Sequence, residues 1–191
     1  MLHDSDFRPT VAGLVLRPVH PRSSYPPVLL QWSSRAAQQG EGNLATPQGG
    51  ITPGEDMLSA MKRELRNEHG LRQRQCRIFP ILHRPFTSMR TRKSYVWFLV
   101  ICDDPVALVP DPSEVAAASW YYCPQTLFTG VRQQMHKGKA RMFSEVFVAA
   151  CEQHPEFFGD YKKIVARFRK RQRYRKIERA MQHRSAQFQH A

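Results

Sequence analysis

Two glutamates four residues apart have the clearest potential for chemistry in this sequence. Glu64 and Glu68 lie in a segment with helical hydrophobic spacing, so both carboxylates are expected on one face of a helix. Such carboxylates repel each other unless a cation lies between them. Lys62 or Arg63 could provide it, and so could Mg²⁺, which prefers carboxylate oxygens and often completes its shell with substrate phosphates. Taken alone, the pattern is more typical of a solvated helix face.

The loop in front of this helix favours an anionic ligand. Residues 47–50 read Pro-Gln-Gly-Gly, and residues 53–55 read Pro-Gly-Glu. Glycines allow a ligand to approach the backbone closely, and the amides at a helix N-terminus attract anionic groups. The loop and the two acids together therefore predict phosphate chemistry.

Residues 49–71 resemble the signature of the Nudix hydrolase family, G-x5-E-x7-R-E-U-x-E-E-x-G-U, in which U is an aliphatic residue. The fixed positions are matched by Gly49, Glu55, Arg63, Glu64, Leu65, Glu68, Gly70 and Leu71. Asn67 is the one departure, because the family has a glutamate there. The resemblance implies a mixed α/β Nudix fold, with a mixed β-sheet sandwiched between α-helices, and a hydrolase of phosphoric anhydride bonds that uses Mg²⁺ or Mn²⁺.

A narrower likeness covers most of residues 7–150 and concerns the substrate. Residues 7–13 and 47–55, and Glu114 followed six residues later by Trp120, are similar to bacterial RNA pyrophosphohydrolases and the related diadenosine polyphosphate hydrolases. This likeness implies removal of pyrophosphate from 5′-triphosphorylated RNA, or hydrolysis of dinucleoside polyphosphates. Asn67 supports a second hypothesis, a Nudix-fold RNA-binding or regulatory protein with weak or no catalysis.

The resemblance also implies roles for individual residues. The expected catalytic residues are Glu64, Glu68 and Glu114, any of which could be the general base. The expected metal ligands are Glu64, Glu68, Glu114, Gly49 and Asn67. The expected substrate-binding residues are Arg8, Gln48, Gly49, Gly50, Lys137 and Lys139, although a surface-charge role is equally compatible with the two lysines. Glu55 and Arg63 are expected to pair and support the loop.

The net charge of +13 is unevenly distributed along the chain. Residues 161–191 contain 11 Lys and Arg against one acid, Glu178, whereas residues 1–160 contain 18 against 15. We therefore expect a Nudix hydrolase domain in residues 1–160 and a basic helical C-terminal extension in residues 161–191.

The extension is expected to bind nucleic acid, because cations contact phosphates and aromatic rings stack on unpaired bases. A final helix packed on the body, or a helix on an anionic membrane surface, are the alternatives. The residues expected to contact nucleic acid are Arg169, Lys170, Arg171, Arg173, Tyr174, Arg175 and Lys176.

Several protein classes are excluded by the remaining pattern. No apolar run approaches the roughly 20 residues of a membrane span, and the N-terminus lacks the features of a signal peptide, so a cytoplasmic protein is expected. The four cysteines lie more than 20 residues apart, which predicts buried or half-buried thiols rather than a zinc site.

The elements that must position the acids follow from hydrophobic periodicity and turn residues. Strands are expected at residues 10–16, 27–32, 77–83, 94–102 and 118–122. Helices are expected at residues 56–69, 141–151 and 155–181. The helix at 56–69 should bury Met57, Met61 and Leu65, with Leu58 alongside. Residues 33–53 should be mostly without regular structure. This order is typical of a mixed α/β domain with helices packed on a sheet.

Overall fold

A computed structural model describes residues 7–18, 26–38, 44–83, 85–89, 91–103, 107–121 and 137–160, and residues 162–163, 165–166 and 169–170. The chain divides into two compact units, Met1–Gly159 and Asp160–Ala191. In the described part of the chain, no helix is long and apolar enough to cross a membrane.

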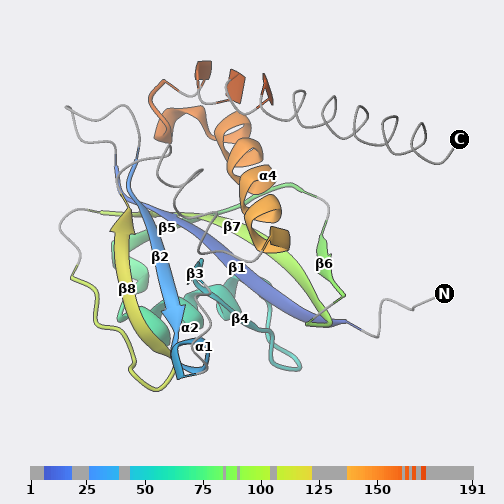
Figure 1. Ribbon diagram of the computed structural model, residues 1–191. Coiled ribbons are helices and arrows are strands. Elements are labelled where there is room, and N and C mark those ends of the chain that lie inside the picture. The colour runs from blue at the N-terminus through green and yellow to red at the C-terminus, as the bar shows by residue number, and fades with distance from the viewer. Residues whose placement is uncertain are drawn as a thin grey trace, which may run out of the picture. The chain divides into compact units, whose positions relative to one another are not determined.

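A mixed sheet forms the centre of the first unit (Figure 1). Its strands are β1 (Arg8–Leu16), β2 (Val28–Ser33), β3 (Leu44–Ala45), β4 (Gln48–Gly50), β5 (Cys76–Pro80), β6 (Phe86–Ser88), β7 (Lys93–Cys102) and β8 (Val115–Tyr121). The strands β3-β2-β1-β7-β5 follow one another across the sheet, while β4 pairs with β1, β6 with β7 and β8 with β2. β1 and β7 run parallel from Arg8 beside Lys93 to Leu16 beside Ile101. The other pairings between the described strands are antiparallel.

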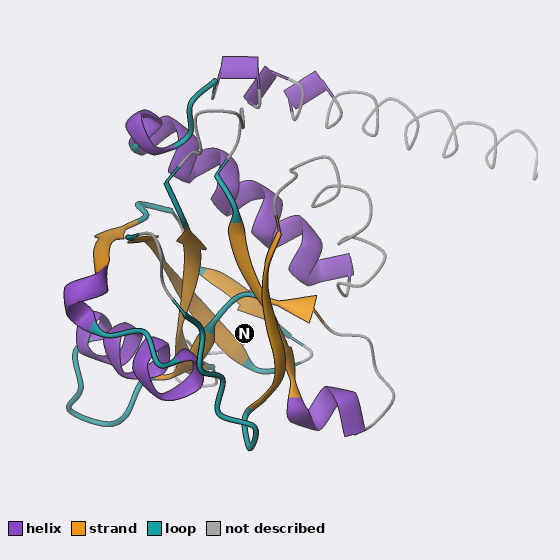
Figure 2. Cartoon of the chain, turned by 90° about the vertical axis from the view of Figure 1, so that its left-hand side faces the viewer, coloured by secondary structure: helices purple, strands orange, loops and turns teal. Residues whose placement is uncertain are grey.

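Helices cover both faces of this sheet (Figures 1 and 2). Helix α2 (Met57–His69) lies on one face and helix α4 (Lys137–Gln153) on the other. The short helix α1 (Ser34–Gln38) follows β2, and single 3-10 turns occupy Gln73–Gln75 and Pro155–Phe157. The mixed α/β fold predicted from the sequence is therefore confirmed.

The core beneath α2 is formed by side chains that point to one face of the sheet. Successive side chains of a strand point to opposite faces, so Val11 and Val15 of β1 pack against α2. They share one buried cluster with Leu29, Ala60, Met61, Leu65, Leu71, Phe98, Val100 and Cys102. Gly13, between the two valines, lets the Met61 side chain lie close to β1, since a Cβ there would be 3.1 Å from Met61 Cε. This cluster fixes the helix that carries the two glutamates.

The predicted long strands are all present, but the sequence prediction misses the short elements. α1, β3 and β4 interrupt residues 33–53, which were expected to be mostly irregular, and β6 was not predicted. The predicted core face of α2 is correct for Met61 and Leu65 and wrong for Met57 and Leu58, whose exposed fractions are 49% and 39%. These two residues lie in the first turn of α2, before the helix reaches the sheet.

The predicted helix at 155–181 does not begin at Pro155. A single 3-10 turn occupies Pro155–Phe157, and Gly159 then takes a positive φ of 54°. Helical backbone is present at residues 162–163, 165–166 and 169–170, and residues 171–181 lie outside the described part. Glycine tolerates a left-handed conformation at no steric cost, so the chain turns between the two units here.

Candidate functional site

Two capping residues, Asp56 and Gly70, define the ends of helix α2. The Asp56 side chain accepts hydrogen bonds from the backbone N–H groups of Leu58 (2.9 Å) and Ser59 (3.0 Å). At the other end Gly70 adopts a left-handed conformation with φ 70°, and its N–H and that of Leu71 donate to carbonyls of the last turn. These caps fix the register in which Glu64 and Glu68 face the sheet.

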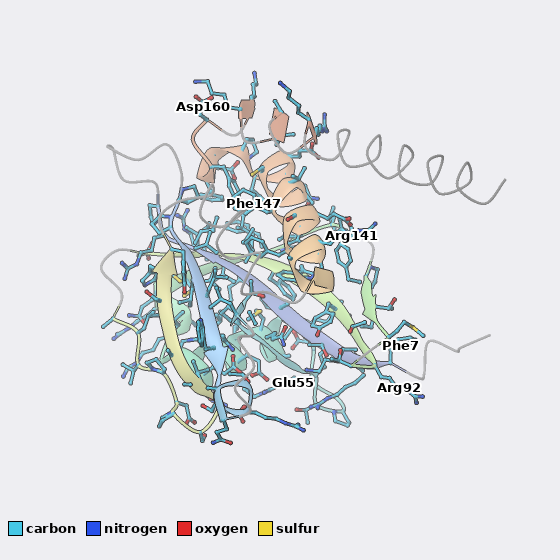
Figure 3. The ribbon with its side chains drawn as sticks, in the orientation of Figure 1. Phe7, Glu55, Arg92, Arg141, Phe147 and Asp160 are labelled. Atoms are coloured by element: carbon cyan, nitrogen blue, oxygen red, sulfur yellow. The ribbon has the colours of Figure 1, made fainter. Side chains whose placement is uncertain are left out.

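The loop before α2 is held by Arg63. Its guanidinium donates two hydrogen bonds of 2.8 Å to the Glu55 carboxylate, and its Nη2 also donates to the Gly50 carbonyl at 2.8 Å. Arg63 Nη1 contacts Glu64 Oε1 as well. The bonds from Arg63, with a further one from the Thr52 N–H, hold the pKa of Glu55 at about 2. Glu55, which is labelled in Figure 3, is therefore a permanent anion, and its pairing with Arg63 ties the glycine loop to the middle of the helix.

Glu68 is the acid of the site whose pKa is raised most. Burial raises its pKa to about 7, and the negative charges of Glu64 and Glu114 add to this rise. The Gln31 side chain donates to Glu68 Oε2 at 3.2 Å, and this bond, with one from the Gln48 backbone, lowers the pKa by a smaller amount. Glu68 thus lies among other negative charges, so an added positive charge beside it would be stabilising.

Gln31 and His69 form a buried polar pair behind Glu68. His69 Nε2 lies 2.5 Å from Gln31 Oε1, and both side chains are almost fully buried. Burial lowers the pKa of His69 to about 4, so its imidazole is neutral at pH 7. Neither residue was predicted, because Gln31 is 37 positions away from Glu68 along the chain and His69 stands at a variable position of the signature.

Glu64 and Glu114 reach the same region from different directions. A Cβ on Gly49 would lie 1.8 Å from Glu64 Cδ, so β4 and the Glu64 carboxylate are in closest contact. Glu114 is exposed, on a loop that Asp111 N–H joins to the Glu68 carbonyl (3.1 Å). The Glu114 carbonyl accepts from Ser34 N–H at 2.9 Å. Both ends of this loop are therefore attached to the elements that hold Glu68.

Two cations line the other side of these acids. Arg8 and Lys93 are register partners on β1 and β7, and a Cβ on Gly50 would lie 2.2 Å from Arg8 Nη2. Burial and the Arg8 charge lower the pKa of Lys93, whereas Glu68 and Glu64 raise it. Arg8 N–H donates to the Arg92 carbonyl (2.8 Å), at the edge where Phe7 and Arg92 lie together (Figure 3). Lys93 was not predicted, because only the pairing of β1 with β7 brings it to the site.

The remaining expected site residues are Asn67, the two lysines of α4 and the basic extension. Asn67 is exposed, and its Oδ1 accepts from Arg66 Nε at 3.4 Å. Lys137 and Lys139 belong to the first turn of α4, and their side chains are not described. Arg169 and Lys170 are exposed. The other expected nucleic-acid contacts lie outside the described residues, and these are Arg171, Arg173, Tyr174, Arg175 and Lys176.

A comparison with models of protein families identifies the family of this chain. The family model described as "NUDIX domain" matches residues 6–146. The chain belongs to the NUDIX family. It is a hydrolase of phosphoric anhydride bonds, as the signature in residues 49–71 predicted.

Solved NUDIX structures share the fold. A binary complex of the C. elegans Ap4A hydrolase is 20% identical, covers 72% of this chain and 97% of its own, and has a TM-score of 0.54. RenU, a Nudix hydrolase of M. smegmatis, is 22% identical with coverages of 78% and 84% and a TM-score of 0.51. A NUDIX-family hydrolase of Clostridium perfringens is 15% identical, with 73% and 95% covered and a TM-score of 0.53. No curated protein matches the chain.

NUDIX hydrolases use divalent metals, and the acids of this site suit a hard cation. Glu68 is a buried carboxylate with neighbouring negative charges from Glu64 and Glu114, and Gly49 leaves no Cβ between the backbone and Glu64. Within the described ranges, no three His, Cys, Asp or Glu side chains are already grouped closely enough to hold a metal ion. Glu64 instead faces Arg63, and Glu114 is exposed. Carboxylates are ligands that a hard divalent cation such as Mg²⁺ prefers, and Mg²⁺ retains waters and takes few carboxylates.

Replacing Asn67 with Glu is expected to lower the Mg²⁺ concentration for half-maximal hydrolysis by about tenfold, because it adds a negative charge one residue before Glu68. Asn67→Gln is the matched control, since it has the same length as the glutamate and no charge. The measurement is hydrolysis rate against Mg²⁺ concentration for the three proteins. Equal curves for Asn67→Glu and Asn67→Gln would show that position 67 does not act on the metal.

Proposed function

We propose that this NUDIX protein is a metal-dependent pyrophosphohydrolase that removes pyrophosphate from 5′-triphosphorylated RNA. The observation that carries the proposal is the pairing of Arg8 and Lys93 beside Glu64 and Glu68. A chain of phosphates needs cations next to the bond that breaks, and Arg8 can contact two phosphate oxygens at once. The glycine loop at Gly49 and Gly50 supports this role, because its backbone is open to close approach.

Glu64, Glu68 and Glu114 have different roles in the proposed hydrolysis. A divalent cation supplies neutralisation of the phosphate charge and a lowered pKa for an attacking water. Glu68 is suited to accept the proton of an attacking water, because its carboxylate is buried beside the negative charges of Glu64 and Glu114. Glu64 is oriented by Arg63, and Glu114 adds charge from the opposite side. Lys93 and Arg8 hold the phosphates while the bond breaks.

Dinucleoside polyphosphates are the second candidate substrates. Ap4A hydrolase is named among the structures with this fold, and the same cations suit any chain of phosphates. A regulatory RNA-binding protein with weak catalysis remains the alternative that Asn67 favours.

The test is release of pyrophosphate, with Mg²⁺ or Mn²⁺, from the same RNA carrying a 5′-triphosphate or a 5′-monophosphate, and hydrolysis of Ap4A in parallel. We expect release from the triphosphate only, at a rate well above that of the Glu68→Gln variant. Equal rates for the unaltered protein and the Glu68→Gln variant, on RNA and on Ap4A, would refute the proposed enzymatic activity. The RNA-binding protein would then be the hypothesis that stands. Turnover of Ap4A alone would refute RNA as the substrate.

The basic extension is proposed to strengthen binding of RNA. Deleting residues 161–191 is expected to weaken RNA affinity at low salt and to flatten its fall with salt, because each lost contact to a single-strand phosphate reduces the slope of log K against log salt by about 0.7. The measurement is RNA affinity by fluorescence anisotropy at several salt concentrations. An unchanged slope after the deletion would contradict the proposed role.

A further inference from the structure

Two cysteines lie opposite each other in the sheet, away from the acids. Cys76 opens β5 and Cys102 closes β7, and the two are register partners in an antiparallel pair. Their Sγ atoms are 3.2 Å apart, and both are free thiols. Because they face each other across adjacent strands, this contact is built into the fold rather than made by chance on a flexible loop.

The hydrogen bonds between β5 and β7 show that Cys76 and Cys102 form the more closely spaced of the two kinds of antiparallel pair. The Asp103 N–H donates to the Gln75 carbonyl at 2.9 Å, so residues 75 and 103 form a hydrogen-bonded pair. The next pair along the strands, Cys76 with Cys102, is then a non-hydrogen-bonded pair. Directly opposed Cα atoms are about 4.5 Å apart in such a pair, which is inside the range of about 4.4–6.8 Å that a disulfide spans. The backbone therefore needs no large movement to be bridged.

The two thiols differ in access. Cys102 is fully buried in the cluster beneath α2, whereas Cys76 is half-buried at the edge of that cluster. A hydrogen bond from Cys102 lowers the pKa of Cys76, and the same contact with burial raises the pKa of Cys102. Cys76 is thus the thiol that a dissolved reagent can reach, and Cys102 is the buried thiol in contact with it.

We propose that Cys76 and Cys102 form a covalent modification site that glutathione disulfide converts to an intramolecular disulfide between β5 and β7. The Cys76 thiolate attacks one sulfur of glutathione disulfide, breaking that S–S bond and releasing one glutathione thiolate. Cys102 then attacks the Cys76 sulfur, breaking the mixed disulfide and releasing the second glutathione. Two protein thiols are oxidised, one glutathione disulfide is reduced to two thiols, and the protons of both cysteines pass to the departing thiolates.

The test uses the full chain incubated with glutathione disulfide, followed by alkylation of the remaining thiols, intact mass and peptide mapping. We expect a product that has lost two hydrogens, carries no glutathione and contains a Cys76–Cys102 cross-link. The bridge closes a loop of more than 20 residues, so the oxidised protein should melt on the order of 10 °C higher than the reduced protein.

Matched variants separate this pair from the other cysteines. Cys102→Ala should stop at a glutathione adduct on Cys76, and Cys151→Ala, which removes a buried thiol of α4, should still form the bridge. Peptide mapping of the unaltered chain decides the matter even if a variant fails to fold. Thiols that all remain open to alkylation, a stable glutathione adduct on Cys76 in the unaltered chain, or a bridge through Cys123 or Cys151 would each overturn the proposal.

Discussion

Replacing Glu68 with Gln is expected to lower kcat for hydrolysis of phosphoric anhydrides by about 10²–10⁴-fold. The substitution keeps the shape and the hydrogen bond to Gln31 but removes the buried carboxylate that can accept a proton beside Glu64 and Glu114. Glu145→Gln is the matched control, because Glu145 pairs with Arg141 on α4, away from the site. The measurement is kcat and KM at saturating Mg²⁺, and a loss confined to KM would show that Glu68 binds rather than catalyses.

The same substitution is expected to stabilise the metal-free protein at alkaline pH. Burial raises the pKa of Glu68 from 4.5 to about 7 in the folded chain, so the protonated carboxyl favours folding. This contribution is fully present below pH 4.5 and is lost as the pH rises through 7, which costs roughly 3 kcal/mol. Glu68→Gln avoids that cost, because its amide never ionises.

Urea unfolding with a chelator present measures this effect. We expect the Gln variant to exceed the unaltered protein by about 2–3 kcal/mol at pH 8 and to match it near pH 4.5. A difference that did not change with pH would show that packing rather than charge is responsible. An inactive but more stable variant would mean that the fold tolerates a buried acid for the sake of its chemistry.

The sequence predicted the elements whose signals are local. Residues 56–69 carry a helical apolar repeat, and the helix Met57–His69 begins and ends within one residue of these bounds. The apolar run of β7 is likewise buried from Trp97 to Cys102. Short strands such as β4 and β6 were missed because three residues carry no period, and only their partners in the sheet define them.

A local signature predicted the Glu55–Arg63 pairing, whereas the neighbours that the sheet brings to the acids were missed. The Glu55–Arg63 contact joins residues eight positions apart, within one motif. Lys93, Gln31 and His69 have no motif of their own. They reach the acids because β7 pairs with β1 and because β2 passes beside the end of α2, and neither pairing is encoded in a local pattern.

The buried pair of Gln31 and His69 is expected to have the second large effect, on both stability and kcat. A carboxylate accepts hydrogen bonds, so the Gln31 NH₂ group must face Glu68, and its carbonyl oxygen then faces His69. That oxygen can only accept, so His69 Nε2 carries the proton that it donates. His69 therefore fixes the orientation of the Gln31 amide, and the amide fixes the Glu68 carboxylate.

Breaking either contact is expected to cost both stability and activity. Gln31→Leu and His69→Phe each leave a buried polar group without its partner, which should destabilise the fold by about 1–3 kcal/mol. Each should also lower kcat by about 10–100-fold, because Glu68 loses its fixed orientation. Ser144→Ala is the control, since it removes a buried hydroxyl that donates to the Ala140 carbonyl at 2.7 Å within α4. It should lose stability without losing kcat.

The double variant Gln31→Leu/His69→Phe separates positioning from structural support. Removing both partners leaves no unpaired group between them, so the free energy of unfolding should recover the part of its loss that came from the unpaired imidazole, while the lost bond to Glu68 is not recovered. Its kcat and its Mn²⁺ affinity should stay close to those of Gln31→Leu alone, because His69 Nε2 bonds to Gln31 and lies 3.7 Å from Glu68 Oε2, beyond hydrogen-bond distance. Urea unfolding, steady-state kinetics and Mn²⁺ binding by electron paramagnetic resonance measure the three quantities. Recovery of kcat together with stability would mean that the pair supports the fold alone, and additive losses of kcat would mean that His69 acts by a separate route.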